Sequence, residues 1–302
     1  MKEGKPSATA EANAAFRAAE WIYPEKERLI YDAFAYRFLG LKFKLIARSR
    51  LLTRIALWYA DRIIPNAQNS VVVRHRYMDD YLEACIDAGV EQLVILGAGY
   101  DSRAYRFDRL SGKVRVFEVD HPDTLAAKVK KVKKVFGALP DHVVYVSIDF
   151  NSEKLGERLF ESGYNKNMRT LFIWEGVTVY LTNSGVDETL SFVSNNSGDG
   201  SSIIFDYAYR SSLDGTLYPE DARKWRAAFE QRAEAPRFGL EEKEIENYLV
   251  ARGFSHVKSV SMESLENVYF RSKGIGRKVT RLGGIVHADV APGKRPIQAD
   301  AS

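Results

Sequence analysis

The chain has 302 residues, of which 45% are hydrophobic and 28% are charged, a mixture typical of a folded globular protein. This balance excludes intrinsic disorder and collagen-like or coiled-coil structure, and the length allows one large α/β domain or two ordinary domains. A single cysteine, Cys85, excludes an intramolecular disulfide and a cysteine-rich metal site. The net charge of +4 is small for this size and does not by itself indicate nucleic-acid binding.

No targeting or membrane-spanning segment is recognisable in the sequence. Residues 1–20 lack the apolar core of a signal peptide, and no stretch reaches the roughly 18 uncharged apolar residues of a membrane span. The nearest stretch, Leu41 to Ile64, is interrupted by seven charged residues. We therefore expect a cytoplasmic protein with no membrane or nucleic-acid partner.

The first ninety residues predict helices, and the pattern changes from Gln92 onward. The expected N-terminal helices are Ala8–Ile22, Glu25–Leu39, Leu41–Ile64 (one basic amphipathic helix or a broken pair) and Tyr77–Ala88. Short apolar runs follow at Gln92–Leu96, Val114–Val119, Val143–Ile148, Leu171–Trp174 and Ile203–Phe205, separated by helical patterns at Pro122–Phe136, Glu153–Glu161 and Ser184–Ser194. A helix at Glu241–Arg252 and strands at His256–Val260 and Gly284–Val290 complete the pattern. This alternation predicts an α/β fold with a doubly wound, mostly parallel sheet.

These elements predict one catalytic domain with additions rather than two separate domains. Residues 1–90 are expected to form a helical cap that belongs to the same domain, and residues 91–291 the catalytic domain, with an insert at about 207–240. Residues 292–302 are expected to form a flexible tail.

A glycine loop, Gly97-Ala98-Gly99, follows the first predicted strand. A strand that runs into such a turn and then into a helix lets a ligand approach the backbone closely. Asp120 ends the second strand about 20 residues further on, where its carboxylate can accept hydrogen bonds from both hydroxyls of an adenosine ribose. The loop and the acidic strand end together predict a nucleotide or nucleoside site.

The loop favours a methyl donor over a dinucleotide. The dinucleotide fingerprint needs a third glycine where Ser102 stands, and the carboxylate of Asp101 would repel a pyrophosphate. No Walker A pattern occurs, which excludes a P-loop. S-adenosylmethionine carries a cationic sulfonium and no phosphate, and we therefore expect it as the cofactor.

Two further strands end in acidic residues. Asp149 precedes the aromatic Phe150, a pair suited to an adenine, whose amine needs an acceptor and whose face needs apolar cover. Glu175 ends the fourth strand, near the expected methionine part of the donor. Ligands of such sheets bind beyond the carboxyl ends of the strands, although acids at these positions also commonly cap the next helix.

Four motifs occur in order along the chain: GAGYDSRAYR, FEVDHP, SIDF and WEGVTVYLT. With flanking motifs they extend over about residues 14–291 and resemble the leucine carboxyl methyltransferase family, most closely its bacterial branch, which includes O-methyltransferases of the tetracenomycin polyketide type. The resemblance implies a class I methyltransferase fold, in which a Rossmann-like sheet carries an N-terminal helical cap and an inserted helical segment before the last strands.

The resemblance also implies roles for individual residues. Relatives hold the methionine carboxylate with two basic residues of the cap, which match Arg17 and Arg74 here, with Arg76 as the alternative to Arg74. The implied cofactor-binding residues are Arg17, Arg74, Gly97, Ala98, Gly99, Asp120, Asp149, Phe150 and Glu175.

The sequence does not identify the methyl acceptor. A carboxylate acceptor needs no base, whereas a hydroxyl acceptor benefits from one. Tyr180, Tyr207 and Tyr209 lie at or just beyond strand ends, and we interpret them as pocket-lining candidates without assigning a catalytic residue.

Several other features have structural interpretations. The lysine run Lys128–Val135 resembles a polybasic nucleic-acid site, but its apolar spacing favours an amphipathic helix with a solvated lysine face. The basic stretch Leu41–Ile64 could contact a membrane surface, but we favour cap packing beside the acceptor pocket. The five histidines show no metal-ligand spacing, so no metal is expected, and Cys85 is interpreted as a small core residue.

We therefore expect an S-adenosylmethionine-dependent O-methyltransferase that acts on a carboxylate or hydroxyl of a small, polyketide-like molecule. Three alternatives stay open: a protein C-terminal carboxyl methyltransferase, an NAD-dependent dehydrogenase and a non-catalytic S-adenosylmethionine-binding protein. The oligomeric state is not indicated by the sequence.

Overall fold

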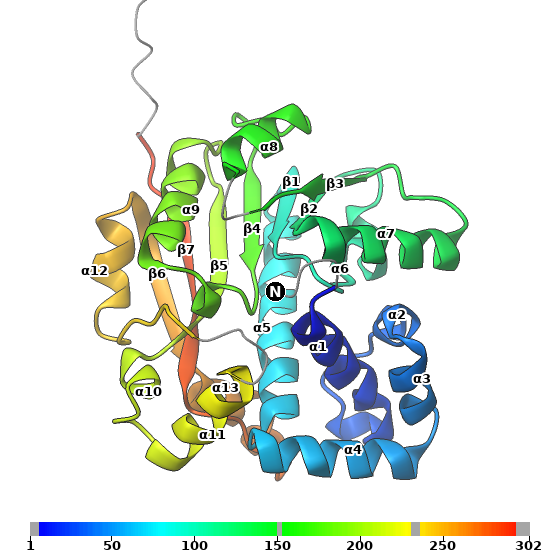
Figure 1. The fold of residues 1–302 in the computed structure, drawn as a ribbon. Helices are drawn as coiled ribbons and strands as arrows, with labels where there is room; N and C mark the ends of the chain where they lie inside the picture. The colour runs from blue at the N-terminus through cyan, green and yellow to red at the C-terminus, as the bar shows by residue number, and fades with distance from the viewer. Residues whose placement is uncertain (1–5, 150–152, 231–235, 294–302) are drawn as a thin grey trace, which may run out of the picture.

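The computed structural model describes residues 6–149, 153–230 and 236–293. Seven strands form one sheet in the order β3-β2-β1-β4-β5-β7-β6 (Figure 1). The strands are β1 (Gln92–Leu96), β2 (Arg115–Asp120), β3 (Val143–Ser147), β4 (Thr170–Trp174), β5 (Ser202–Ala208), β6 (Phe254–Ser261) and β7 (Gly283–Val290). The first five strands are parallel, whereas β7 is antiparallel to both β5 and β6. The predicted α/β fold with a mostly parallel sheet is confirmed.

Helices cover both faces of this sheet (Figure 1). Those ahead of β1 are α1 (Ala8–Ala18), α2 (Ala33–Phe38), α3 (Leu41–Ala47), α4 (Arg50–Ile63) and α5 (Ala67–Asp87). Those that follow are α6 (Arg103–Arg106), α7 (Pro122–Phe136), α8 (Leu155–Glu161), α9 (Asn183–Asn195), α10 (Arg210–Leu213), α11 (Pro219–Glu230), α12 (Ile245–Val250) and α13 (Met262–Tyr269). None of the helices within the described ranges is long and apolar enough to cross a bilayer.

Alternate side chains of each strand enter two separate hydrophobic clusters. Along β1, Leu93 and Ile95 pack into one cluster, whereas Val94 and Leu96 pack into the other. The first cluster also contains buried residues of α1, α2 and α5, so the N-terminal helices share a core with the sheet. In Figure 1, α1 to α4 lie together beyond one end of the strands.

Two of the expected N-terminal helices are wrong in extent. Residues Glu25–Leu39 do not form one helix: a 3-10 turn at Glu25–Glu27 is followed by non-helical chain, and α2 begins only after Asp32. The Asp32 carboxylate accepts hydrogen bonds from the amides of Phe34 and Ala35, which caps the start of α2. The last helix before β1 begins ten residues earlier than expected, because α5 already starts at Ala67.

The stretch Leu41–Ile64 is a broken pair of helices, one of the two predicted forms. The hydroxyl of Ser49 accepts a hydrogen bond from the amide of Leu52 at 3.3 Å and so caps the start of α4. Helix α4 runs along the lower edge of the molecule in Figure 1.

A candidate active site at the carboxyl ends of the strands

Two cavities meet where the strands end and the N-terminal helices begin. One has a volume of about 350 Å³ and contains the glycine loop, and the other has a volume of about 500 Å³ and lies among the cap helices. Both cavities are lined by Thr9, Asn13, Arg74, Gly176 and Tyr180. A ligand in the first cavity and a ligand in the second would therefore face each other across these shared residues.

The first cavity, called here the donor cavity, brings together the residues predicted to bind the cofactor. It is lined by Arg17, Arg74, Gly97, Ala98, Gly99, Asp120, Asp149 and Glu175. Phe150, the remaining predicted residue, lies outside the described residues. Arg76, the alternative to Arg74, is half-exposed and pairs with Asp80 on its own helix, away from this cavity.

The glycine loop needs its glycines for two reasons. Gly97 and Gly99 have φ angles of +67° and +42°, which side chains other than hydrogen rarely permit. A Cβ on Gly97 would also lie 2.3 Å from Cγ2 of Val177, and one on Gly99 would lie 3.0 Å from Cβ of Ala10. The backbone of this loop therefore packs closely against Val177 and Ala10.

Asp120 ends β2 beside this loop. One carboxylate oxygen accepts a hydrogen bond from the Gly99 amide at 2.5 Å, and the other accepts one from the His121 amide at 2.6 Å. Burial raises the pKa of the Asp120 carboxyl above its usual value, although these two amides act in the opposite direction. The two bonds fix the carboxylate at the cavity wall.

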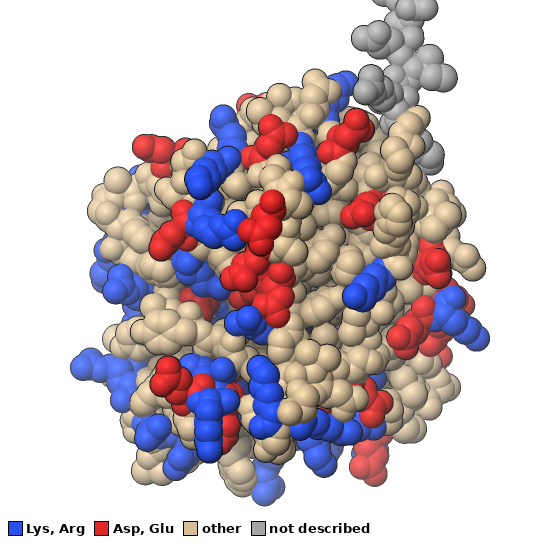
Figure 2. Space-filling model, turned by 180° about the vertical axis from the view of Figure 1, so that it is seen from behind, with Lys and Arg blue, Asp and Glu red and all other residues tan. Residues whose placement is uncertain are grey.

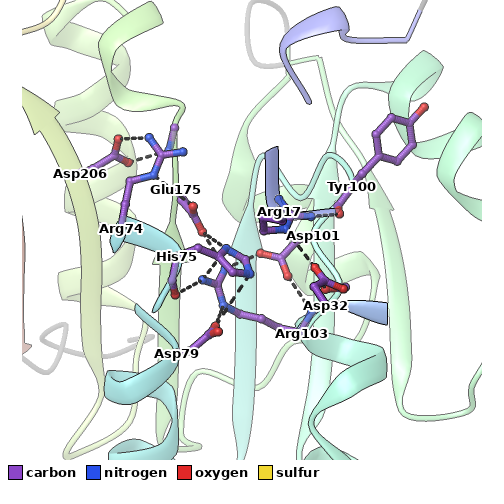
Figure 3. A network of polar contacts seen from close by, with 12 residues as sticks. Arg17, Asp32, Arg74, His75, Asp79, Tyr100, Asp101, Arg103, Glu175 and Asp206 are labelled. Atoms are coloured by element: carbon purple, nitrogen blue, oxygen red, sulfur yellow. Dashed lines mark hydrogen bonds and ion pairs between the residues drawn. The ribbon is translucent and has the colours of Figure 1, made fainter. Parts of the chain in front are cut away.

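Arg74 links the two cavities. Its Nε donates to Glu175 Oε1 at 3.1 Å, and its Nη1 donates to Asp206 Oδ2 at 2.8 Å (Figure 3). Burial alone would lower the pKa of the guanidinium, but the carboxylates of Asp206 and Glu175 raise it above the usual value. Arg74 therefore stays charged and holds the two acids at the ends of β4 and β5 in fixed positions.

Beneath Glu175, the fully buried Arg103 is the centre of an ion network (Figure 3). Its guanidinium donates to Glu175 Oε2 at 2.8 Å and to Asp79 Oδ1 at 2.7 Å. It also forms an ion pair with Asp101. Although burial alone would lower the pKa of this guanidinium, the three carboxylates raise it well above its usual value.

The acids of this network are held in their charged form. Burial alone would raise the pKa of the Glu175 carboxyl, but contacts with His75, Arg103 and Arg74 hold it well below its usual range. The pKa of Asp101 is likewise lowered by Arg103 against the effect of burial. Burial, together with Arg103, lowers the pKa of His75, so its imidazole is neutral at neutral pH.

The Asp101 carboxylate has a different role from the one expected. The sequence suggested that its charge would repel a phosphate, but Arg103 neutralises it within the protein.

Arg17 reaches the donor cavity from α1. Its Nε donates to Asp32 Oδ2 at 3.0 Å, and its Nη2 donates to the carbonyl oxygen of Tyr100 at 2.5 Å (Figure 3). Burial alone would raise the pKa of Asp32, but Arg17 lowers it. The Arg17–Asp32 pair thus joins α1, the start of α2 and the loop after β1.

His75, Asp101 and Glu175 each offer one atom that can ligate a metal, and these three atoms lie within 4.8 Å of one another. The histidines have no metal-ligand spacing along the sequence, and this grouping arises only in the fold. The Arg103 guanidinium lies within hydrogen-bond distance of all three side chains. We therefore assign this cluster to the arginine.

The second cavity, called here the acceptor cavity, is mainly apolar. Its lining includes Phe16 of α1, Phe43 and Ile46 of α3, Leu57 of α4, and Trp225 of α11. Trp225 comes from the predicted insert at about 207–240.

The three tyrosine candidates differ in position. Tyr180 lines both cavities and Tyr207 lines the acceptor cavity, whereas Tyr209 does not line either one and its hydroxyl faces Glu242 at 3.4 Å. The Tyr207 hydroxyl bonds to Ser259 at 2.8 Å, and burial raises the pKa of Tyr207 to about 12. A neutral, hydrogen-bonded phenol is consistent with a lining role.

Asp206, near the end of β5, was missed by the sequence analysis. It lines the acceptor cavity, accepts a hydrogen bond from the Gly176 amide at 2.6 Å, and pairs with Arg74. Burial raises the pKa of its carboxyl, partly offset by Arg74. The signal was present in the sequence, because Asp206 directly follows the apolar run Ile203–Phe205, much as Glu175 follows the run Leu171–Trp174.

The lysine run on α7 had been expected to form a solvated face, but one of its lysines is buried. Lys128 is fully buried, pairs with Glu118 at 2.8 Å, and donates to the carbonyl oxygen of Ala98 at 3.3 Å. This lysine therefore supports the glycine loop from below. Lys130, Lys133 and Lys134 are exposed, as predicted.

Comparison with known proteins agrees with this geometry. Residues 10–194 match the sequence profile of the family described as leucine carboxyl methyltransferase.

The chain belongs to the leucine carboxyl methyltransferase family.

Its relatives include bacterial proteins that carry the provisional name S-adenosyl-L-methionine-dependent methyltransferase. One, YktD of Bacillus subtilis, is 32% identical over 213 residues, which cover 67% of this chain and 66% of YktD. A relative from Mycolicibacterium smegmatis is 33% identical over 224 residues, covering 73% of this chain and 68% of its own. A third, SCO7813 of Streptomyces coelicolor, is 35% identical over 132 residues, which span less than half of either chain.

A solved structure shows the same fold. The crystal structure of a provisionally described methyltransferase from Thermobifida fusca superimposes with a TM-score of 0.57 and 13% identity, over 96% of this chain and 97% of that one.

Proposed function

We propose that the protein is an S-adenosylmethionine-dependent O-methyltransferase that methylates a hydroxyl group of an apolar small molecule. The observation that carries this proposal is the contact between two unlike cavities, one polar and one apolar, at Arg74, Gly176 and Tyr180. Methyl transfer from a sulfonium requires donor and acceptor to meet in line with water excluded. Two adjoining cavities with shared walls satisfy this requirement.

The donor cavity suits S-adenosylmethionine along its length. The fixed carboxylate of Asp120 can accept hydrogen bonds from the ribose hydroxyls, and Asp149 lines the part expected to hold the adenine. The ionised Glu175 carries negative charge near the junction, where the cofactor would supply an electrophilic methyl group on a cationic sulfur. Arg17 and Arg74 are the cations we assign to the methionine carboxylate.

Asp206 favours a hydroxyl acceptor over a carboxylate. It lines the acceptor cavity and bonds to Arg74 and the Gly176 amide, which belong to residues that line both cavities, and burial raises the pKa of its carboxyl. A buried carboxylate at this place can accept the proton of an attacking hydroxyl but repels an acceptor that is itself an anion. We therefore assign Asp206 as the general base.

The apolar lining also favours a small molecule over a protein C-terminus. Among the described lining residues, the basic ones are Lys42 and Arg74, and Arg74 also lines the donor cavity. Walls that are mostly apolar suit an uncharged apolar acceptor better than a charged peptide terminus.

Isothermal titration calorimetry with S-adenosylhomocysteine tests the donor assignment. We expect micromolar binding that weakens at least tenfold in Asp120→Ala, because two ribose hydrogen bonds are lost. NADH should not bind. Absence of S-adenosylhomocysteine binding at high micromolar concentration, or tight NADH binding, would overturn the proposal in favour of the dehydrogenase alternative.

The assignment of the acceptor is tested by measuring turnover. Release of S-adenosylhomocysteine is to be followed with a panel of phenols, apolar alcohols, carboxylic acids and a peptide ending in leucine. Turnover restricted to the phenols and alcohols supports the proposal. Turnover of the peptide alone would contradict it, and donor binding without turnover of any class would favour the non-catalytic alternative.

A further inference from the structure

Helix α4 is apolar on two opposite sides. Its inner side, with Thr53, Ala56, Leu57 and Ala60, forms part of the wall of the acceptor cavity. The expectation that this stretch packs in the cap and borders the acceptor pocket describes that side alone. The outer side has a composition that packing does not explain.

The outer side exposes large apolar side chains at helical spacing. They are Leu51, Leu52, Ile55, Trp58, Tyr59 and Ile63. Leu51 is 66% exposed, Trp58 58% and Tyr59 63%. Because residues four and seven apart share a helix face, Leu51, Ile55 and Trp58 form one continuous stripe. Leu41 and Leu45 extend exposed apolar surface onto α3.

The same segment concentrates positive charge. Residues 41–63 contain six lysines and arginines and one acidic residue, whereas the whole chain has a net charge of only +4. The rest of the chain is therefore close to neutral. Arg62 lies on the apolar stripe, with its guanidinium 4.2 Å from the centre of the Trp58 ring. Seen from behind, lysine and arginine side chains are prominent along the lower edge of the molecule (Figure 2).

This composition fits an anionic lipid surface better than a second copy of the chain. Leucine, tryptophan and tyrosine between arginines are typical of helices that lie in the headgroup region of a bilayer. A symmetric dimer through α4 would place two such basic segments opposite each other, and interface cores are depleted of charge. Anionic headgroups instead complement the segment.

The exposed surface is continuous with the acceptor cavity. Tyr59 and Ile63 belong to the outer apolar surface and also line the cavity, as does the exposed Lys42. A lipophilic molecule in a bilayer beneath α4 would therefore reach the cavity along a largely apolar path.

We propose that the outer face of α3 and α4 docks on an anionic lipid bilayer, and that the acceptor is a lipophilic molecule drawn from it. The second half of this statement rests on the proposed function, whereas the first does not. The expectation of no membrane partner is thereby revised for one surface, on which the helices lie without crossing the bilayer.

Co-sedimentation of the full chain with vesicles tests the docking, without any donor or acceptor present. The protein should bind vesicles that contain phosphatidylglycerol and bind phosphatidylcholine vesicles much more weakly, and added salt should release it. Ile55→Ser/Trp58→Ser should weaken binding at least tenfold. Arg54→Ala and Arg62→Ala should each weaken it about fivefold, the effect of about one basic residue near an anionic surface.

Matched controls come from other exposed positions. Val250→Ser on α12 and Lys133→Ala/Lys134→Ala on α7 change exposed apolar and basic residues elsewhere and should leave vesicle binding unchanged. Lack of wild-type binding to anionic vesicles at low salt overturns the proposal, as does equal weakening by the controls. A dimer in light scattering that Ile55→Ser/Trp58→Ser dissociates, without vesicle binding, would assign the face to a second copy.

The two proposals fail separately. If S-adenosylhomocysteine does not bind but anionic vesicles do, the docking surface stands and the enzymatic function falls. If the donor binds and dissolved acceptors turn over but vesicles do not bind, only the docking proposal falls. When both hold, a lipophilic alcohol should be methylated faster in anionic vesicles than in phosphatidylcholine vesicles, and this difference should disappear in Ile55→Ser/Trp58→Ser.

Discussion

The donor cavity and the acceptor cavity are built in opposite ways. The donor cavity combines residues at and just after the ends of β1, β2 and β4 with residues of the N-terminal helices, and its charges are fixed by a buried ion network. The acceptor cavity collects mostly apolar residues from α1, α3, α4, α11 and the ends of β5 and β7. Short local motifs in the sequence therefore indicate much of the donor cavity, whereas the acceptor cavity depends on how distant segments pack. This contrast predicts that single substitutions will damage donor binding and stability more sharply than they alter the apolar walls.

The largest expected effect is the loss of the arginine under the donor cavity. Arg103→Met should lower the free energy of unfolding by about 3–5 kcal/mol, because Asp101 would remain buried without its cation and Asp79 and Glu175 would each lose one of two arginine partners. Urea denaturation measures it. The control is Arg109→Ala, whose exposed pair with Asp87 should contribute only about 0–1 kcal/mol. Equal effects of the two variants would contradict the central role of Arg103.

A substitution of Asp206 should affect methyl transfer while leaving donor binding nearly unchanged. Asp206→Asn should lower kcat about 100-fold with a hydroxyl acceptor, because the base is lost, while the affinity for S-adenosylhomocysteine changes little. The wild-type rate should fall in acid as this carboxylate, whose pKa is raised by burial, takes up a proton, and the variant should lack that acid limb. Asp187→Asn, on α9 and outside both cavities, serves as the control. A variant that keeps both kcat and the acid limb would remove Asp206 from the reaction.

A substitution at Gly97 tests how closely the donor must approach the glycine loop. Gly97→Ala should cost about 1–2 kcal/mol of stability because of its positive φ, and donor affinity should fall at least tenfold because the added Cβ would displace Val177. Gly112 has a φ of +71° with open space around its Cβ position, so Gly112→Ala should show only the loss of stability that its φ causes, with unchanged affinity. Calorimetry and thermal unfolding distinguish the two effects, and equal affinities would contradict the close approach.

The smallest effect is a pH dependence of stability. The pKa of His75 is lowered from 6.5 in the folded protein, so the unfolded chain takes up a proton first as the pH falls. Stability should decline below pH 6.5 with a slope of up to about 1.4 kcal/mol per pH unit. The lowered pKa of Glu175 adds a further loss as the pH falls below its usual 4.5. Urea unfolding between about pH 8 and 5 should show the first decline in the wild type but not in His75→Gln, and a flat wild-type profile would contradict a neutral, buried His75.

Local signals explain which parts of the fold could be predicted. The predicted β1 and α7 coincide with the structure, because the apolar run of β1 ends at Gly97 and α7 lies between Pro122 and Gly137. The non-helical stretch before α2 was missed because a long-range contact holds it, in which the Leu29 amide donates to the Glu20 carboxylate.

Long-range contacts explain the rest. Lys128 looks like a surface residue in a helical pattern, and only its pairing with Glu118, a charge inside the buried strand β2, places it in the core. No local sequence motif marks the apolar residues that line the acceptor cavity, such as Leu57 and Trp225. The glycine loop and the acidic strand ends could be predicted because each lies next to a recognisable strand.

The most direct test of the two-cavity account is a crystal structure with S-adenosylhomocysteine bound. The account predicts the ribose hydroxyls on Asp120, the amino-acid part near Arg74 and Glu175, and the sulfur directed past Tyr180 toward the acceptor cavity. A ligand bound elsewhere, or one whose sulfur points away from the acceptor cavity, would contradict it.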